Sequence, residues 1–301
     1  MKSFLKQIFL SQIILAFVFF LVLSTGTLAT ANEEVPEVLT IGIIPGGNPD
    51  QVKKESIELA SELQSALGIK VNIYISKDYN TLIEAMKEKK VDFAFLTALS
   101  FVYAEKTAQA KVLLKKIYNE PFYFSALVTS NKSKIKRFVD LKGKIIAFVD
   151  AKSTSGYLYP KAQLKKINFN DSDFKSIIFS GNHSNSVKLL EEGKVDVIAV
   201  FSDDAKGKNG AWTKFSKEKK FKVLWVSSPI PTDPFTVRQD FYTKYPNVVH
   251  SVMVNLVDLF EKSKMQKKYR EILGEKELMP ATSKQYDPVR EVIKNLDIEI
   301  K

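Results

Sequence analysis

Three consecutive hydroxyl side chains, Ser153, Thr154 and Ser155, stand directly before Gly156 and a predicted helix. A hydroxyl oxygen at a helix start accepts a hydrogen bond from a free backbone N–H group, and one hydroxyl is enough to cap the helix. The same free N–H groups, at the positive end of the helix dipole, also bind oxyanions. Because capping needs only one of the three hydroxyls, the run favours an anion-binding loop over a plain helix cap.

A histidine begins the next predicted helix, since His183 follows Gly181 and Asn182. Lone histidines are commonly structural or solvated. At the same edge of the fold as the hydroxyl run, however, His183 would donate a hydrogen bond to an oxyanion and titrate with it near neutral pH. The residues leave both interpretations open. His250, the second histidine of the chain, lies within another predicted helix and is expected at the surface.

A tyrosine and two carboxylates also follow predicted strands. Tyr79 stands after Asp78 at a strand end, where its side chain either packs or presents its hydroxyl to a ligand. Asp203 and Asp204 would repel an anion unless one of them accepts a proton from a partly protonated ligand. The alternative is that the pair caps a helix. The sequence does not decide between these two roles.

The composition argues against the common enzyme classes. The chain of 301 residues has no cysteine and only two histidines, so thiolate chemistry and a zinc site of several His or Cys ligands are excluded. Neither a Gly-x-Ser-x-Gly elbow nor a phosphate-binding Gly-x-x-x-x-Gly-Lys-Ser/Thr loop is present. Gly46-Gly47 is no dinucleotide fingerprint, and no carboxylate cluster suits an oxygen-loving metal. We therefore expect a binding protein without a metal or cofactor.

The net charge of +11 indicates an anionic partner. The lysines are scattered in short groups, most of them beside Glu or Asp, and no Arg-rich run with interleaved aromatic residues is present. This pattern is typical of a solvated surface, and it argues against nucleic acid as the partner.

The first residues have the pattern of a secretory signal peptide. Lys2 and Lys6 precede an apolar run over residues 8–23, and Ala29-Thr30-Ala31 follows. The alternative, a retained membrane anchor, would need about 20 apolar residues. We expect cleavage after Ala31 and, because no cysteine follows that could carry a lipid, a free periplasmic protein.

Short apolar runs alternate with helical patterns along the rest of the chain, which predicts α/β lobes with parallel-rich sheets and right-handed crossovers. The predicted strands cover residues 38–44, 71–75, 91–96, 144–149, 176–179 and 195–200. The predicted helices cover residues 50–67, 80–90, 156–167, 185–192, 248–262 and 266–273, the last two packing back on the first lobe. Two crossovers, over residues 122–129 and 223–235, are expected to join the lobes.

These elements divide the chain into a signal peptide and two lobes. The expected segments are 1–31 (signal peptide), 32–125 (first lobe), 126–228 (second lobe) and 229–301 (return to the first lobe). Parallel α/β sheets bind ligands beyond the carboxyl ends of their strands. The polar loops at these ends should therefore face one another and line a cleft with hydrogen-bond donors.

Several motifs, taken in order, resemble the phosphate/phosphite/phosphonate-binding proteins of ABC transporters. The clearest is Ser-Thr-Ser-Gly-Tyr-Leu-Tyr-Pro at residues 153–160, which is similar to a Ser-x-Ser-Gly-aromatic-Leu-x-Pro segment of that family. The others are Asp78-Tyr79, VDFAFL at 91–96, Gly181-Asn182-His183 with Val187, Gly193-Lys194-Val195-Asp196 and SPIPTDP at 228–234. The resemblance covers about residues 38–295.

The resemblance implies a two-lobed type II periplasmic binding fold with a two-strand hinge, which closes around one oxyanion. It carries the ligand-binding role to Tyr79, Ser153, Thr154, Ser155, His183 and Asp233, and to Asp203 in preference to Asp204.

One departure concerns the ligand. Family members can carry a tyrosine in the loop after the third strand, where this chain has Leu96-Thr97-Ala98. We expect this loop to bind through Thr97 and the backbone N–H groups around Ala98. A compact ligand, phosphite or methylphosphonate, fits this loop as well as or better than a large aminoalkylphosphonate. The expected function is capture of such an anion by a monomer that delivers it to an ABC permease in the inner membrane. The alternatives are a sensory module for phosphorus oxyanions or a binder that prefers phosphate.

Overall fold

The first of two six-stranded sheets is mixed, with a parallel half and an antiparallel half. The computed structural model describes residues 34–44, 49–118, 120–217, 220–266, 269 and 277–300. Across the first sheet the strand order is β12-β4-β11-β3-β1-β2. The parallel strands are β1 (Val38–Ile43), β2 (Lys70–Ile75) and β3 (Phe93–Phe95). The antiparallel strands are β4 (Ala110–Ile117), β11 (Pro234–Arg238) and β12 (Glu277–Pro280).

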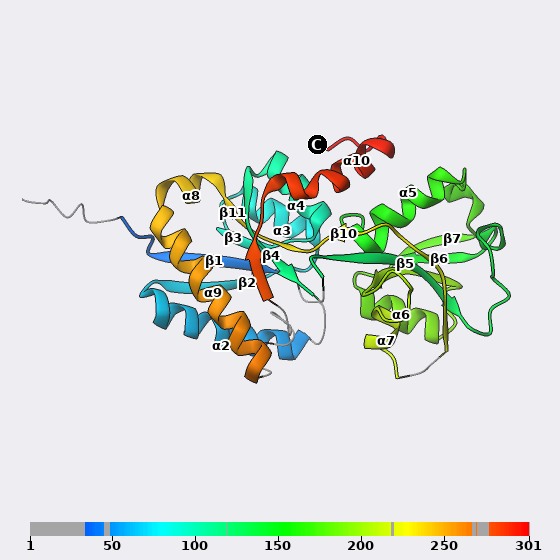
Figure 1. Cartoon of the computed structure of the whole chain (residues 1–301), viewed down its shortest axis with the longest axis horizontal. Coiled ribbons are helices and arrows are strands. Elements are labelled where there is room, and N and C mark those ends of the chain that lie inside the picture. The colour runs from blue at the N-terminus through cyan, green and yellow to red at the C-terminus, as the bar shows by residue number, and fades with distance from the viewer. Residues whose placement is uncertain are drawn as a thin grey trace, which may run out of the picture. The chain divides into compact units, whose positions relative to one another are not determined.

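Helices cover both faces of this sheet (Figure 1). One face packs against α2 (Pro49–Leu67), α8 (Gln239–Lys244) and α9 (Pro246–Gln266). The other face packs against α3 (Tyr79–Lys87), α4 (Ala98–Thr107) and α10 (Asp287–Asn295). A strand covered on both faces is apolar on both, which explains why β1 appears in the sequence as an apolar run interrupted only by Thr40. Gly42 lets α3 approach closely, since a Cβ atom there would lie 2.4 Å from Leu82.

The second sheet repeats this layout. Its strands follow the order β10-β5-β8-β6-β7, and β9 pairs with β5. They are β5 (Phe122–Ser130), β6 (Ile145–Phe148), β7 (Ser176–Phe179), β8 (Val197–Ser202), β9 (Phe221–Val226) and β10 (Ile230–Pro231). One face packs against α6 (His183–Glu191) and α7 (Ala211–Lys214), and the other against α5 (Tyr159–Lys166). We call the parts built on the two sheets the first lobe and the second lobe.

The predicted strands are confirmed, and so is the two-lobed α/β fold. In each sheet only the three strands of the βαβαβ unit run parallel, and the remaining pairs are antiparallel. The sequence interpretation missed α4, whose residues 98–104 are buried, because a helix that is apolar on all sides shows no amphipathic period. It also missed β4, β12 and α10.

The chain crosses between the lobes twice, at neighbouring positions. Residues 118–121 join β4 to β5, and residues 232–233 join β10 to β11. Strand pairing on both sides, Ile230 with Tyr123 and Pro234 with Lys115, holds the two passages side by side. The passages therefore lie closer to the first lobe than the predicted crossovers. Residues 124–129 already pair with β8 on one side and largely with β9 on the other.

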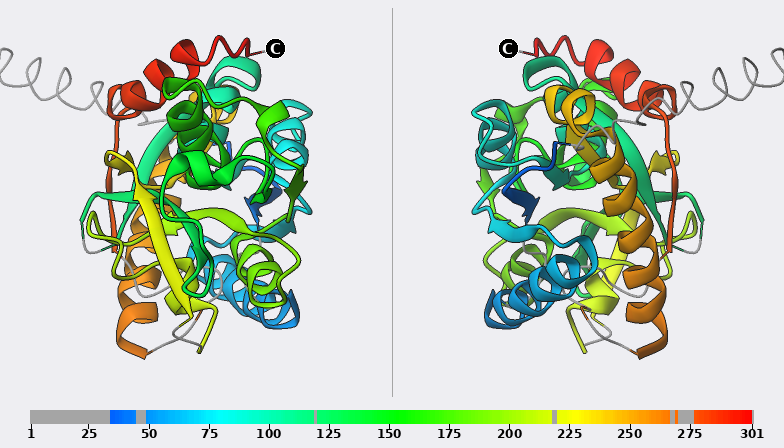
Figure 2. Two further views of the ribbon diagram at one scale, coloured as in Figure 1. Left: turned by 90° about the vertical axis from the view of Figure 1, so that its right-hand side faces the viewer. Right: turned by 90° about the vertical axis from the view of Figure 1, so that its left-hand side faces the viewer.

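The C-terminal helix α10 packs against both lobes (Figure 1) and lies along the upper edge of both views in Figure 2. Val289 and Ile293 of α10 share one apolar cluster with Phe101 of α4 and with Tyr159 of α5. Of the helices predicted to return to the first lobe, α9 does so. The helix predicted over 266–273 and the signal peptide predicted over 1–31 lie outside the described residues. None of the described helices combines the length and the apolar character needed to cross a membrane.

Candidate functional site

The hydroxyl loop opens a helix, as predicted, and Ser153 is its cap. The Ser153 hydroxyl oxygen accepts a hydrogen bond from the Gly156 N–H at 3.0 Å. The helix begins with one wide π-helical turn over Thr154–Leu158 and continues as α5. A Cβ atom at position 156 would lie 2.5 Å from Val149, so only glycine fits this turn. Because Ser153 does the capping, the hydroxyls of Thr154 and Ser155 remain for other partners.

The N-terminus of α4 in the first lobe meets this loop directly. The Leu99 N–H donates to the Thr154 hydroxyl oxygen at 2.9 Å. Thr97 caps α4 by accepting from the Ser100 N–H at 3.1 Å, and its hydroxyl lies 3.1 Å from the carbonyl oxygen of Lys152. The Ala98 N–H, at the first position of the helix, has no acceptor among the described residues. Thr97 is thus engaged in capping, which leaves the backbone of Ala98 as the donor that this loop can offer.

Two phenols and a carboxylate gather beside the hydroxyl loop. Tyr79 is the first residue of α3, which Asp78 caps through a 2.6 Å hydrogen bond from the Thr81 N–H. Burial raises the pKa of Tyr79, and the charge of Asp233 adds to the shift. Burial, together with Asp233, likewise raises the pKa of Tyr123, while hydrogen bonding to the Ser155 and Thr154 hydroxyls opposes it. Both phenols therefore stay protonated and can donate hydrogen bonds.

Tyr123 was not predicted as a site residue. It lies in β5, immediately after the passage between the lobes. Ser125, on the same side of the strand, donates from its hydroxyl to the Ser155 carbonyl oxygen at 2.6 Å. In the sequence the segment PFYFSAL is an apolar strand, and the alternation of Tyr123 and Ser125 is the one signal that could have marked a polar face.

Asp233 lies in the other passage between the lobes. The hydroxyl of Tyr118 donates to its carboxylate at 3.0 Å. Burial raises the pKa of Asp233 to about 6, although the positive charge of Lys116 opposes this shift. The carboxyl group is therefore partly protonated near neutral pH. In that state it can share a proton with an oxyanion instead of repelling it.

His183 begins α6, as predicted, with Asn182 as the cap. Its ring packs edge-on against Phe201, with centroids 5.0 Å apart, and its Nδ1 atom is buried without a hydrogen-bond partner among the described residues. Burial lowers the pKa of His183 to about 3, and the charge of Lys214 adds to this effect. The expectation that His183 titrates near neutrality is therefore wrong, because burial keeps its imidazole neutral in the folded chain. The neutral ring keeps one buried nitrogen available for a ligand.

The two neighbouring aspartates of the second lobe have different roles. The Asp204 carboxylate accepts hydrogen bonds at 2.9–3.2 Å from the N–H groups of Lys206, Lys208 and Asn209, and so organises its own loop. No such contact engages the Asp203 carboxylate in the described part of the chain. Desolvation raises the pKa of Asp203, while Lys214 opposes the shift. This difference supports the choice of Asp203 over Asp204.

Apart from Thr97 and Ser153, which cap helices, the predicted residues fall into two neighbouring groups. The first consists of Tyr79, Ala98, Thr154, Ser155 and Asp233, joined by Tyr123. The second consists of His183 and Asp203, which Lys214 links electrostatically. His250 is exposed, as expected. The described residues include no group of three or more His, Asp or Glu side chains that could hold a metal ion. Hydroxyls, phenols, an imidazole and a free N–H at helix starts can bind an oxyanion.

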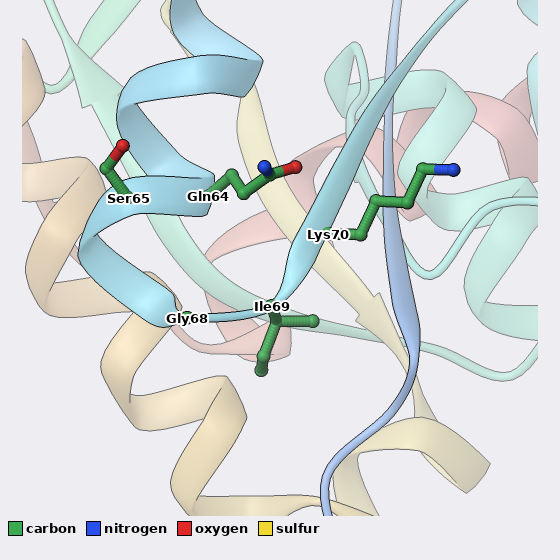
Figure 3. Close-up of a pocket in the computed structure, with 5 residues that line it drawn as sticks. All are labelled: Gln64, Ser65, Gly68, Ile69 and Lys70. Carbon is green, nitrogen blue, oxygen red and sulfur yellow. The ribbon is translucent and has the colours of Figure 1, made fainter.

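A separate pocket carries no comparable chemistry. It lies between the end of α2 and the start of β2 and is lined by Gln64, Ser65, Gly68, Ile69 and Lys70 (Figure 3). Ser65 and Lys70 point away from each other there. The pocket is at the amino ends of the parallel strands, opposite the edge that carries the candidate site.

Comparisons with known proteins identify the family of this chain. Residues 41–286 match the family model described as "ABC transporter, phosphonate, periplasmic substrate-binding protein". The chain is 29% identical over 286 residues to the "Phosphonates-binding periplasmic protein" of Escherichia coli (strain K12), covering 92% of this chain and 82% of the relative. It is 24% identical over 274 residues to the "Probable ABC transporter phosphite binding protein PhnD1" of Prochlorococcus marinus (strain MIT 9301), covering 87% and 91%.

A solved structure of PhnD1 from Prochlorococcus marinus (MIT 9301) in complex with methylphosphonate has the same fold. The TM-score is 0.74 at 21% identity, and the superposition covers 88% of this chain and 100% of the other. The family model spans most of the described residues, including the hydroxyl loop, His183 and Asp233. The chain therefore belongs to the family of periplasmic substrate-binding proteins of phosphonate ABC transporters.

Proposed function

We propose that this protein captures phosphite or a small phosphonate, such as methylphosphonate, between its lobes and delivers it to an ABC permease in the inner membrane. The observation that carries the proposal is the meeting of the hydroxyl loop of the second lobe with the N-terminus of α4 in the first lobe, where the Leu99 N–H reaches Thr154. The names of the two relatives, for phosphonates and phosphite, support the ligand class.

The arrangement of donors supports a tetrahedral oxyanion as the ligand. Hydrogen-bond donors from both lobes lie together at this site. They are the hydroxyls of Thr154 and Ser155, the phenols of Tyr79 and Tyr123, and the Ala98 N–H. Phosphite has a P–H bond and methylphosphonate a P–C bond where phosphate has a fourth oxygen. Where the P–H or P–C group meets an apolar contact, the fourth oxygen of phosphate would lose its hydrogen bonds to water without replacing them, at a cost of about 1 to 3 kcal/mol for each polar group left unpaired.

We further propose that the protein is a receptor and not a catalyst, and that it acts as a monomer. Within the described residues His183 lies beside Phe201 and Lys214 and contacts no serine or carboxylate that could form a nucleophile–base pair with it. Export through a signal peptide cleaved after Ala31 would bring the receptor to the periplasm.

Calorimetric titration with phosphite, methylphosphonate, phosphate and sulfate tests the ligand and the site together. We expect phosphite or methylphosphonate to bind most tightly. Because a charge-assisted hydrogen bond contributes roughly 1.5 to 3 kcal/mol, Thr154→Ala should weaken binding at least several-fold. Thr107→Ala is the matched control, since that hydroxyl donates only to the Tyr103 carbonyl oxygen of its own helix. Unchanged affinity for both Ser153→Ala and Thr154→Ala would exclude this site.

Lobe closure on the ligand is the second part of the proposal. The two adjacent passages, near residues 118–121 and 232–233, would act as the hinge, so the lobe boundaries fall at these passages and not at residues 125 and 228, since β5 and β10 already belong to the second sheet. Small-angle scattering should give a smaller radius of gyration with saturating ligand than without it. Equal radii in both states would argue for a rigid binder.

A further inference from the structure

A proline interrupts the hydrogen bonds of the helix that carries the hydroxyl loop. In the wide first turn of this helix, an N–H group donates to the carbonyl oxygen five residues earlier, and the last such bond joins Tyr159 to Thr154. The next bond in the series would join residue 160 to the Ser155 carbonyl oxygen. Residue 160 is a proline and has no N–H to donate. The Ser155 carbonyl oxygen therefore has no partner within its own helix.

The same proline accounts for the width of the turn. In a regular α-helix the ring of a proline clashes with the carbonyl group four residues earlier, which for Pro160 is that of Gly156. Here the Gly156 carbonyl oxygen is turned toward the Val149 N–H, from which it accepts a hydrogen bond at 3.1 Å. Pro160 thus favours the wide turn and leaves the Ser155 carbonyl oxygen in need of a donor from another element.

Ser125 of β5 supplies this donor. Its hydroxyl donates to the Ser155 carbonyl oxygen at 2.6 Å, and both residues are buried. Ser227, directly after β9, holds the backbone of Ser125 on both sides. The Ser227 hydroxyl oxygen accepts from the Ser125 N–H at 2.9 Å, and the Ser227 N–H donates to the Ser125 carbonyl oxygen at 2.9 Å. The Ser125 hydroxyl is therefore presented to the loop from a fixed strand.

The peptide group between Ser155 and Gly156 is consequently held at both ends. Ser125 donates to its carbonyl oxygen, and the Ser153 hydroxyl oxygen accepts from its N–H at 3.0 Å. A fixed peptide plane fixes the backbone torsion of Ser155 that adjoins it, and with it the direction of the preceding N–H groups. In the part of the chain that the structure describes, the N–H groups of Thr154 and Ser155 have no backbone acceptor. They remain available to an oxyanion.

We propose that Ser125 is a positioning residue for the ligand, because its hydroxyl replaces the N–H that Pro160 lacks and so holds the hydroxyl loop in its binding shape. The inference rests on the proposed function, in which the oxyanion occupies this loop. The Ser125 hydroxyl proton is engaged by the Ser155 carbonyl oxygen, so Ser125 acts on the ligand through Ser155. Without that hydroxyl the buried carbonyl group is left unpaired, which favours rotation of the peptide group out of this shape.

A double-mutant cycle tests this role by calorimetric titration with phosphite and methylphosphonate. Ser125→Ala should weaken binding at least about fivefold, since a buried hydrogen bond that orients the loop is lost. Adding Pro160→Ala returns an N–H at position 160, which can donate to the Ser155 carbonyl oxygen. The double variant should therefore bind within about twofold of Pro160→Ala alone. Such a recovery is not expected if Ser125 only fills space in the core.

Thr129→Ala is the matched control. Thr129 lies on the same strand and is equally buried, and its hydroxyl also donates to a backbone carbonyl oxygen, that of Asp196, at 2.7 Å. This variant should bind both ligands as the wild-type protein does. A thermal melt of each variant confirms that it is folded at the temperature of the titration.

The outcomes separate this inference from the function on which it rests. If the wild-type protein binds either ligand and Ser125→Ala binds it equally well, the positioning role is excluded. Losses that add in the double variant, or an equal loss in Thr129→Ala, exclude it as well, because Ser125 then contributes only to folding. If the wild-type protein binds neither these ligands nor phosphate, the proposed function fails and the positioning role fails with it.

Discussion

The two lobes use the same Lys-Val-Asp segment to join neighbouring parallel strands, at residues 90–92 and 194–196. In the first lobe the Asp92 carboxylate accepts a hydrogen bond from the Thr40 N–H at 2.8 Å, and the Asp92 N–H donates to the Thr40 carbonyl oxygen at 2.9 Å. In the second lobe Asp196 makes the same two contacts with Ile145, at 2.8 Å and 2.9 Å.

The difference lies in what covers the carboxylate. Asp92 is buried and pairs at 2.7 Å with Arg238, which the chain contributes after its return from the second lobe. Asp196 is only half-buried and has no arginine partner among the described residues; its carbonyl oxygen accepts from the Thr129 hydroxyl at 2.7 Å. A buried carboxylate is costly without a counter-charge, whereas a hydrated one is not. The first lobe therefore depends on its return segment, and the second lobe completes the same structure from within one segment.

Removing Arg238 should have the largest effect. Arg238→Met leaves the buried Asp92 carboxylate without its partner and should lower the free energy of unfolding by about 3 to 5 kcal/mol. Chemical denaturation measures this, with Arg137→Met as the control, since the Arg137 side chain is 77% exposed beside Asp140. A loss as small as that of the control would mean that Asp92 does not need its counter-charge.

The matching change in the second lobe should cost less. Asp196→Ala removes the acceptor of the Ile145 N–H and should lower the free energy of unfolding by about 1 to 3 kcal/mol, because one backbone donor loses its partner. Asp92→Ala in the same denaturation series should cost more, since it also leaves Arg238 unpaired. Equal losses for the two alanine variants would remove the distinction between the lobes.

Asp233, between the lobes, should change stability in a pH-dependent way. Its pKa is raised from 3.8 to about 6 in the folded state, so folding favours the protonated form. The free energy of unfolding therefore falls as pH rises from 3.8 to about 6, because the unfolded chain loses this proton first. Above that window the whole cost of burying the charged carboxylate applies. Asp233→Asn should increase the free energy of unfolding at pH 7 to 8 by roughly 1 to 2 kcal/mol, allowing for solvent screening, and have little effect below about pH 4.

Thermal melts of the ligand-free protein between pH 4 and 8 measure this dependence. Asp140→Asn is the control of opposite sign, because hydrogen bonds from the Lys136 and Arg137 N–H groups lower the pKa of Asp140. Its carboxylate stabilises the fold above its unfolded pKa, and that contribution is lost as pH falls. A gain for Asp233→Asn that is the same at every pH would contradict the burial of its charge.

The smallest effect is expected at the ion pair between Lys165 of α5 and Asp297, at 2.6 Å, which joins the second lobe to the C-terminal segment. Both side chains are largely exposed, so Lys165→Met should change the free energy of unfolding by less than about 1 kcal/mol. Denaturation in low and high salt checks this. A loss comparable to that of Asp196→Ala would mean that this surface pair, and not the apolar cluster around α10, joins the lobes.

Local sequence was sufficient for most of the parallel strands and for the helix starts of the site. Buried strands appear as continuous apolar runs, and Asp78, Ser153 and Asn182 each cap the helix they precede. The pattern did not locate α4, because that helix is buried nearly all round and has no polar face. It also did not identify Tyr123 as a polar residue among the apolar residues of β5.

The sequence by itself determined the parallel strands, their order and the positions of the caps that open the helices of the site, because these depend on residues close together in the chain. Only the tertiary structure decided the ionisation and the partners of the site residues. His183 is neutral because burial and Lys214 lower its pKa, and Asp233 is partly protonated because burial raises its pKa. These pKa values depend on burial and on nearby charges, and the residues that supply them are far apart in the sequence. Lys116 and Asp233 are an example, because only folding brings them into contact.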